Sequence, residues 1–411
     1  MEKEARFIYD PIHGHIQLDS EFWPVIDNPV FQRLRNLKQL GTTCYVFPSA
    51  THTRFEHSIG VAYLSNKYIK MLKKKQPELE ITSRDISNVS LAGLLHDLGH
   101  GPFSHIFDAD VLPALNIKGW AHEEASVNLF KYMIDEYNLD IEESDRKEIS
   151  DMILGNGHGF KHQIVNNKLN SIDVDKMDYI DRDCYSLGFR AIPYDTMRVL
   201  KCSRVIDDVI CYNDKVVHSV YSLFQNRFSL FQQCYSHKVG QSIALMIRDA
   251  LVLAEPHLNL KERIQDPQEY YRLDDNVLNE ILYTESPELQ PAKKIINDIS
   301  FRNLYRYAGE IILPQTSPYE HITSEKIAGY APNLQPDNLI VKDFKLTYGN
   351  PADQVWYYSQ KDQRHKIPKE RISNLLPYYD SDRYVRVFVK DPQKLQTAKS
   401  ALEAFKKAET H

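Results

Sequence analysis

The sequence predicts a mainly α-helical protein with a short β-hairpin and a small α/β lobe near its C-terminal end. Apolar residues recur at helical spacing over most of the chain, strict alternation is confined to one short stretch, and strand-like and helix-like segments alternate towards the end. A hydrophobic content of 42% and an aromatic content of 11% are typical of a globular protein. We expect a core at residues 1–311, a linker at 312–338 and the lobe at 339–411.

The expected elements follow in chain order. Residues 7–18 predict a strand and a turn, and the apolar spacing predicts helices over 22–40, from about residue 53, over 117–136 and over 222–254. Residues 204–221 alternate and predict a hairpin that turns at Asn213 and Asp214. The segment 312–338 is rich in proline and polar residues, which is typical of a linker.

The most informative stretch covers residues 90–105. Its apolar residues predict a buried helix that ends in the adjacent pair His96 and Asp97 and is followed by glycines. Buried imidazoles and carboxylates need partners, and a metal ion satisfies several of them at once. His57 and Asp175, on other predicted helices, add a nitrogen and an oxygen donor. A mixed set of this kind suits iron, manganese, magnesium or zinc with open coordination positions.

The density of histidines supports the same hypothesis. Six of the 16 histidines fall between residues 52 and 122. A metal-activated water beside an imidazole acid is suited to the hydrolysis of phosphate esters. Arg54, Lys176 and Arg227 are cations that could neutralise a polyphosphate. We expect His13, His15 and His52 to be structural.

Composition excludes other classes of protein. The net charge of −6 provides no overall basic field that would attract nucleic acid, so nucleic-acid binding is possible but unsupported. The five cysteines, without CxxC spacing, indicate neither a disulfide framework nor a zinc knuckle. No apolar signal region or run of about eighteen apolar residues occurs, so we expect a soluble protein in the cytoplasm or nucleus, without membrane contact.

The order of His57, the pair His96 and Asp97, and then Asp175, with the local text HDLGHGPFSH, resembles the HD-domain phosphohydrolases. Longer segments resemble the SAM-and-HD-domain dNTP triphosphohydrolases, in the order DPIHGHIQL, FQRLRNLKQLG, YVFPSATHTRFEHSIGV, IDVDKMDYIDRDC and YSHKVG. The resemblance runs from about residue 6 into the lobe, so residues 1–311 would form an HD-domain helical core. Because it starts almost at Met1, we expect no SAM domain before it.

The resemblance implies hydrolysis of a deoxynucleoside triphosphate to a deoxynucleoside and inorganic triphosphate. The implied metal ligands are His57, His96, Asp97 and Asp175, which would hold Fe, Mn or Zn, while Mg would bind the substrate phosphates. The implied catalytic group is His100, Asp108 and His122, which would also support a second metal, with His105 as the acid that protonates the leaving 5′ oxygen. The implied substrate contacts are Arg54, Lys176, Tyr179 and Arg227 on the triphosphate, Gln39 and Asp183 on the 3′-hydroxyl, and Tyr235 against a ribose 2′-hydroxyl.

The resemblance also implies effector sites, filled by GTP or dGTP and by a dNTP, that build a homotetramer from homodimers. The implied guanine contacts are Asp27, Gln32 and Arg35, with Arg6 and Arg302 on the phosphates. The implied contacts of the neighbouring dNTP are Arg198, Lys215, His237 and Lys238. Tyr9, Asn213 and Ser219 stand where the family has Asn, Arg and Asn. A missing arginine contact costs on the order of 1–3 kcal/mol, so we expect altered activation.

Two alternatives stay open. An HD-family nucleotidase that acts on deoxynucleoside monophosphates would leave Lys176, Arg227 and Tyr235 without a role. A catalytically inactive nucleotide- or nucleic-acid-binding protein predicts a damaged metal set, whereas all four implied ligands are present.

Overall fold

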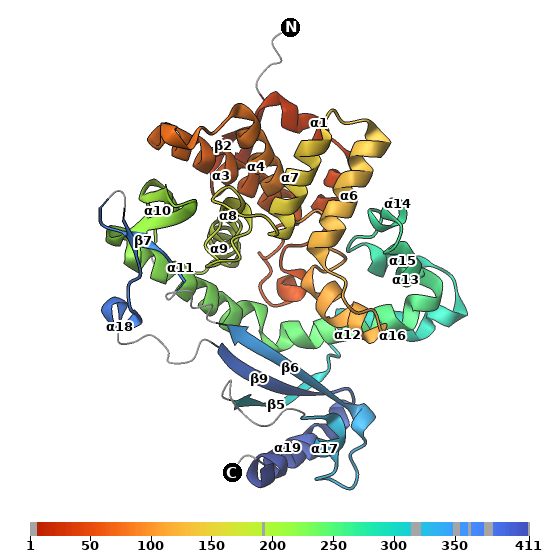
Figure 1. The fold of residues 1–411 in the computed structure, drawn as a ribbon. Helices are drawn as coiled ribbons and strands as arrows, with labels where there is room; N and C mark the ends of the chain where they lie inside the picture. The colour runs from red at the N-terminus through yellow and green to blue at the C-terminus, as the bar shows by residue number, and fades with distance from the viewer. Residues whose placement is uncertain are drawn as a thin grey trace. The chain divides into compact units, whose positions relative to one another are not determined.

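The structure is a computed structural model that describes residues 6–190, 194–313, 322–347, 354–360, 363–373 and 381–409. In these residues the fold is mainly α-helical with small β-sheets, which confirms the predicted class (Figure 1). The chain forms two compact units. Unit 1 comprises residues 1–226, 255–280 and 351–376, and unit 2 comprises residues 227–254, 281–350 and 377–411. None of the described helices combines the length and apolar character that a membrane span requires.

The helices of unit 1 are α1 (Trp23–Ile26), α2 (Pro29–Gln32), α3 (Arg54–Lys75), α4 (Ser83–Leu95), α5 (Leu112–Ala114), α6 (His122–Tyr137), α7 (Glu143–Leu154), α8 (His162–Val165), α9 (Val174–Leu187), α10 (Thr196–Lys201), α13 (Leu260–Arg263), α14 (Pro267–Tyr270) and α18 (Lys369–Ile372). Its strands are β1 (Phe7–Asp10), β2 (Gly14–Gln17), β3 (Ser203–Ile206), β4 (Val209–Asn213), β7 (Tyr357–Tyr358) and β8 (Arg364–His365). Three of the described helices begin in one unit and end in the other: α11 (Val217–Leu230), α12 (Lys238–Leu258) and α15 (Val277–Tyr283).

Helix α3 organises unit 1, because it packs against both α4 and α9. A capping box starts it: the backbone N–H of Thr53 donates to Glu56 Oε1 at 2.8 Å, which satisfies an N–H that helix geometry leaves unpaired. Thr82 and Asp85 form the same box at the start of α4. These caps fix where the two helices begin and therefore which side chains face the space between them.

The prediction of one continuous helix over residues 22–40 is wrong. The structure has α1, α2 and a 3-10 turn at Arg33–Asn36 instead. Asn28 accepts a hydrogen bond from the N–H of Val30 at 3.0 Å, and Pro29 has no N–H to extend the preceding helix. A new helix, α2, therefore begins directly after Asn28.

The predicted hairpin exists, but its predicted turn is wrong. Strands β3 and β4 pair antiparallel, with Ile206 opposite Val209, so the turn is Asp207 and Asp208. Both have positive φ, 48° and 59°, which suits a two-residue hairpin turn and which aspartate tolerates better than most residues. Asn213 instead caps the following helical turn. The helix predicted over 222–254 is likewise broken, by a π-helical turn at Phe231–Tyr235.

The described residues of unit 2 include a three-stranded antiparallel sheet in the order β5 (Arg306–Leu313), β9 (Ser381–Val389), β6 (Leu339–Thr347). They also include α16 (Gln290–Ser300), α17 (Ser324–Ala328) and α19 (Leu395–Glu409). Alternate residues of β9 face opposite sides, so Val387 packs in the cluster with Leu402 of α19, while Phe388 packs with Leu245 of α12. Helices therefore cover both faces of this sheet.

The expected boundary at residue 311 falls within β5, which pairs with β9 of the expected lobe. Residues 314–321 of the expected linker lie outside the described residues, as do 348–353, 361–362, 374–380 and 410–411 of the expected lobe. The described part of the linker contains the last two residues of β5, α17 and a 3-10 turn at Pro336–Asn338, so it carries regular structure. The division of the chain at 311 and 339 stays a prediction.

Candidate metal centre and active site

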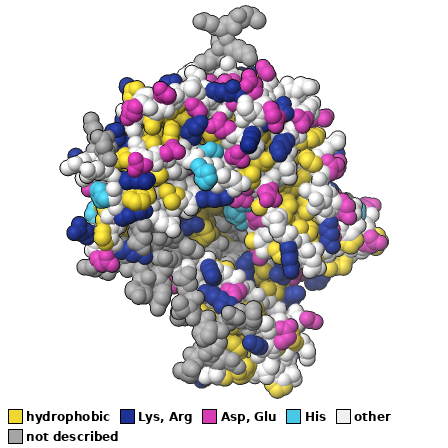
Figure 2. Space-filling view, viewed as in Figure 1, with side chains coloured by type: hydrophobic (Ala, Val, Ile, Leu, Met, Phe, Trp, Pro, Cys, Tyr) yellow, Lys and Arg dark blue, Asp and Glu magenta, His cyan; other side chains and the backbone are white. Residues whose placement is uncertain are grey.

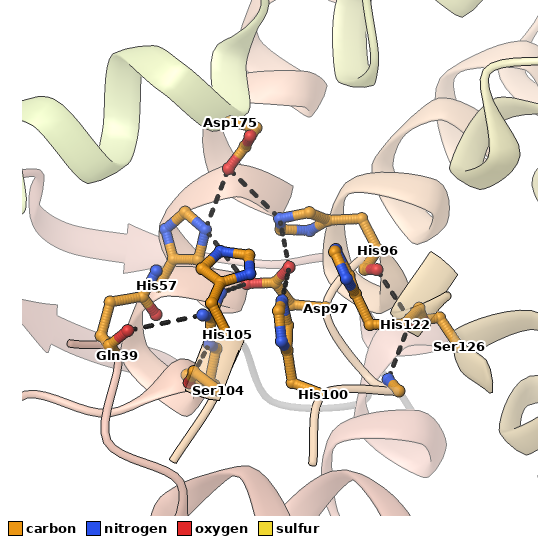
Figure 3. A network of polar contacts seen from close by, with 12 residues as sticks. Gln39, His57, His96, Asp97, His100, Ser104, His105, His122, Ser126 and Asp175 are labelled. Atoms are coloured by element: carbon orange, nitrogen blue, oxygen red, sulfur yellow. Dashed lines mark hydrogen bonds and ion pairs between the residues drawn. The ribbon is translucent and has the colours of Figure 1, made fainter. Parts of the chain in front are cut away.

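Two histidines and two aspartates from three helices of unit 1 point towards one another (Figure 3). His57 lies in the first turn of α3, His96 and Asp97 follow the last residue of α4, and Asp175 lies in the first turn of α9. His57 Nε2 lies 3.1 Å from Asp175 Oδ1 and 3.5 Å from Asp97 Oδ2. His96 Nε2 lies 3.4 Å from Oδ1 of each aspartate. These four residues are called the HD cluster below.

The donor atoms of the HD cluster fit a divalent metal ion. His57 Nδ1 donates to Asp178 Oδ2 and His96 Nδ1 donates to the carbonyl of Gly93, each at 2.8 Å, so both Nε2 atoms turn towards the carboxylates. His96 Nε2 is buried and has no hydrogen-bond partner among the described residues. Two imidazole nitrogens beside two carboxylates are a set that zinc, iron and manganese accept, with positions left for other ligands.

Electrostatics in the cluster support the same interpretation. Burial lowers the pKa of His57, but hydrogen bonds with Asp175 and Asp178 outweigh it and raise that pKa to about 10. Burial alone would raise the pKa of Asp97, but the Arg54 guanidinium and the neighbouring histidines hold it well below its usual range. A cation therefore competes with protons held between these groups, and its binding releases them.

A second group of side chains that could hold a metal ion lies beside the first: His100, His105, Asp108 and His122, whose potential ligand atoms fall within 4.8 Å of one another. The His100 and His122 rings stack at 3.9 Å, and Asp108 Oδ2 lies 3.0 Å from His122 Nδ1. Burial and the Arg54 charge hold the pKa of His100 well below its usual value, so His100 is neutral near pH 7. Burial lowers the pKa of His122, but its bond to Asp108 outweighs this and raises it. His105 is 68% exposed.

The loop that carries His100 is held by buried residues for which the sequence gives no local signal. Arg33 donates to the carbonyl of Leu98 at 2.9 Å and to that of His100 at 2.5 Å. The Tyr270 hydroxyl donates to the carbonyl of Gly99 at 2.6 Å. These bonds tie the turn after Asp97 to distant parts of unit 1, which explains how a glycine-rich segment can hold an imidazole in place.

Five of the seven implied substrate contacts lie in unit 1. Arg54 donates to Asp97 Oδ2 at 2.5 Å and to Ser104 Oγ at 3.1 Å, and the Tyr179 ring lies 6.5 Å from that of His57. Lys176 pairs with Asp173 at 3.0 Å.

The two implied contacts of the 3′-hydroxyl share a neighbour. His52 Nε2 donates to Asp183 Oδ1 at 2.7 Å, and the His52 carbonyl accepts from the N–H of Gln39 at 3.0 Å. Gln39 Oε1 is buried without a hydrogen-bond partner among the described residues. Arg227 and Tyr235 belong to unit 2, where both contact the ring of Phe231.

The implied effector residues form separate small groups. Arg6 pairs with Asp27 at 2.6 Å. Arg35 donates to Gln32 at 2.7 Å, and its guanidinium stacks on Phe55 at 3.5 Å.

The other implied effector residues divide between the units. Arg198 donates to the carbonyl of Lys215 at 3.5 Å in unit 1. His237, Lys238 and Arg302 lie in unit 2, where Lys238 lies over the ring of Tyr307. Tyr9, which stands where the family has Asn, is 73% exposed on β1.

The sequence matches two family models, the HD domain over residues 54–183 and the HD associated region over residues 194–328. The deoxynucleoside triphosphate triphosphohydrolase SAMHD1 homolog of Dictyostelium discoideum is 41% identical over 412 residues, which cover 97% of this chain and 80% of that protein. The chain belongs to the SAMHD1 family of HD-domain dNTP triphosphohydrolases. Human SAMHD1 is 38% identical over 443 residues, 94% of this chain and 70% of that protein. Chicken SAMHD1 is 38% identical over 450 residues, which cover 95% of this chain and 73% of that protein.

Membership of the SAMHD1 family confirms the resemblance drawn from the motifs. The HD domain match includes all four members of the HD cluster and the whole second histidine group. Sequence reasoning singled out His13 and His52 only as structural residues. In the structure they hydrogen-bond to Asp178 and Asp183 of α9, 2.6 and 2.7 Å away. Their sequence separation from α9 explains why no local pattern indicates these contacts.

Proposed function

We propose that this protein hydrolyses deoxynucleoside triphosphates to a deoxynucleoside and inorganic triphosphate. The observation that carries the proposal is the HD cluster, in which two imidazole nitrogens and two carboxylates from three helices face one another. The curated relatives at 38 to 41% identity are named dNTP triphosphohydrolases, which supports the same substrate.

The HD cluster would hold the metal, with Fe, Mn or Zn as the candidate ions, and Mg would accompany the substrate phosphates. A metal held there supplies Lewis acidity towards a phosphate ester. Arg54 keeps Asp97 ionised and oriented, and it offers a cation to the phosphates beside the cluster. Lys176 and Tyr179 complete the proposed triphosphate contacts of unit 1, and the resemblance also implies Arg227 as a phosphate contact.

The second histidine group would move the protons. His105 is exposed enough to reach a substrate, and Asp108 Oδ2 lies 3.5 Å from its Nδ1, where the carboxylate can orient the ring. His105 would then donate its proton to the leaving 5′ oxygen. His100 is neutral, and with His122 and Asp108 it provides further acid–base groups or ligands for a second ion.

The sugar end of the substrate would meet Gln39 and Asp183. Gln39 Oε1, which is buried and has no hydrogen-bond partner in the described part of the chain, is an acceptor suited to a hydroxyl donor, and His52 orients Asp183. Tyr235 would exclude a ribose 2′-hydroxyl.

Activation by GTP or dGTP and a dNTP, and assembly from dimer to homotetramer, are also proposed. The paired Arg6 and Asp27, and the paired Gln32 and Arg35, present exposed or half-buried hydrogen-bonding groups for a guanine nucleotide. Over the described surface in Figure 2, basic and acidic side chains are interspersed, so this face does not favour a nucleic acid. A location in the cytoplasm or nucleus stays a prediction.

The deciding experiment is incubation of dATP with the protein and Mn²⁺ or Mg²⁺, with and without GTP, and separation of the products by chromatography. Deoxyadenosine and triphosphate in equal amounts would support the proposed reaction, and dependence on GTP would support the effector site. If dAMP were hydrolysed and dATP were not, the monophosphate nucleotidase would replace this proposal.

A further inference from the structure

A buried polar network lies directly behind the HD cluster. Asp178 of α9 is fully buried and accepts four hydrogen bonds. His57 Nδ1 and Arg182 Nε each donate to its Oδ2 at 2.8 Å. His13 Nε2 and Arg182 Nη2 donate to its Oδ1 at 2.6 and 2.9 Å. One carboxylate thus holds a member of the HD cluster, an arginine and a histidine of the N-terminal hairpin.

The network continues into the hairpin of β1 and β2. Arg182 Nη1 donates to Asp10 Oδ2 at 2.8 Å. Asp10 Oδ1 accepts the backbone N–H groups of Ile12 and His13 at 2.8 and 2.9 Å, so the same side chain shapes the hairpin turn. The hairpin turn, Asp10, Arg182, Asp178 and His57 therefore form one continuous chain of hydrogen bonds. The Arg182 guanidinium contacts both carboxylates, Asp10 and Asp178, at 2.8 Å.

The packing of α3 on α9 makes room for this network. His57 and Gly60 lie three residues apart on α3 and therefore share a face. A Cβ atom at Gly60 would lie 2.0 Å from Asp178 Oδ1 and 2.4 Å from Arg182 Nη2. Any larger residue at position 60 would push the carboxylate away from His57.

We propose that Asp178 is a positioning residue for the metal ligand His57, and that Arg182 and Asp10 extend this support to the N-terminal hairpin. A carboxylate that accepts from Nδ1 fixes the ring orientation of His57 and turns the Nε2 lone pair to the metal. The inference rests on the proposed function only in taking His57 as a metal ligand. The position of the hairpin then affects how tightly the HD cluster binds its ion.

The test measures binding of Mn²⁺ alone to the metal-free full chain, by electron paramagnetic resonance titration without nucleotide. Loss of a hydrogen-bonded carboxylate behind a ligand histidine typically weakens metal binding by about 10–100-fold, and this is the expectation for Asp178→Asn. Asp10→Asn should weaken binding less, by a few-fold. Asp145→Asn is the matched control, because Asp145 accepts from Arg84 and Asn88 in a surface network of the same unit, and its Mn²⁺ affinity should not change.

Circular dichroism would verify that each variant is folded. A folded Asp178→Asn with wild-type Mn²⁺ affinity overturns the proposal. If Asp178→Asn does not fold, Asp10→Asn decides: weaker binding supports the proposal and unchanged binding overturns it. In a positioning role, saturating Mn²⁺ should also restore the metal occupancy of each variant. His57→Ala separates the two proposals, because unchanged Mn²⁺ binding in that variant contradicts His57 as a ligand and thus the proposed function itself.

Discussion

Gly99 is the position in the turn after Asp97 at which one methyl group should have the largest effect. A Cβ atom there would lie 2.1 Å from the backbone nitrogen of Ser126, 2.3 Å from the carbonyl oxygen of His122 and 2.5 Å from the carbonyl carbon of Ala125. All three atoms belong to the backbone of α6, which cannot rotate away as a side chain can. Because ordinary contact begins at 3.4 Å, the turn must move by about 1.3 Å (3.4 − 2.1).

This displacement strains two hydrogen bonds. The N–H of Gly99 donates to Ser126 Oγ at 2.8 Å, and the Tyr270 hydroxyl donates to the Gly99 carbonyl at 2.6 Å. At roughly 0.5–1.5 kcal/mol each, their loss costs about 1–3 kcal/mol, and overpacking adds about 1–3 kcal/mol. Gly99→Ala should therefore lower the free energy of unfolding by about 2–6 kcal/mol.

Urea unfolding followed by circular dichroism measures this change, and metal analysis of the folded fraction should show lower metal content, because His96 and His100 flank the turn. Gly329→Ala is the matched control. Its Cβ would meet nothing closer than 3.4 Å and its backbone has a negative φ, so the change should stay within about 0.5 kcal/mol. A Gly99→Ala protein as stable and as rich in metal as the wild type would refute the reasoning.

Three further predictions concern single side chains. Asp175→Ala should abolish metal binding and dNTP turnover while circular dichroism stays that of the wild type, since Asp175 faces both His57 and His96 from the start of α9; appreciable hydrolysis would contradict the ligand assignment. Arg35→Ala should reduce activation by GTP in a coupled dATP assay and leave metal content unchanged, and an intact GTP response would remove Arg35 from the effector site. Tyr270→Phe leaves the buried Gly99 carbonyl without its donor and should cost about 1–3 kcal/mol in urea unfolding; a change below about 0.5 kcal/mol would show that the bond contributes little.

Local patterns predicted those elements whose formation depends on nearby residues. The helix that starts after Thr53 and the apolar helix that ends just before His96 were both predicted. The hairpin was predicted with the wrong turn, because Asn213–Asp214 and Asp207–Asp208 are both polar pairs suited to a turn. The choice between them depends on strand pairing, which a single segment does not encode.

The sequence by itself determined the family of this protein and the order of the candidate metal ligands along the chain, and it predicted their chemistry. Only the tertiary structure decided how those residues are held. His13 meets Asp178 across a separation of 165 residues, and Arg182 meets Asp10 across 172. Such contacts arise when helices and a hairpin pack around buried charges that must be paired, and this requirement acts in space and leaves no period or motif in the sequence.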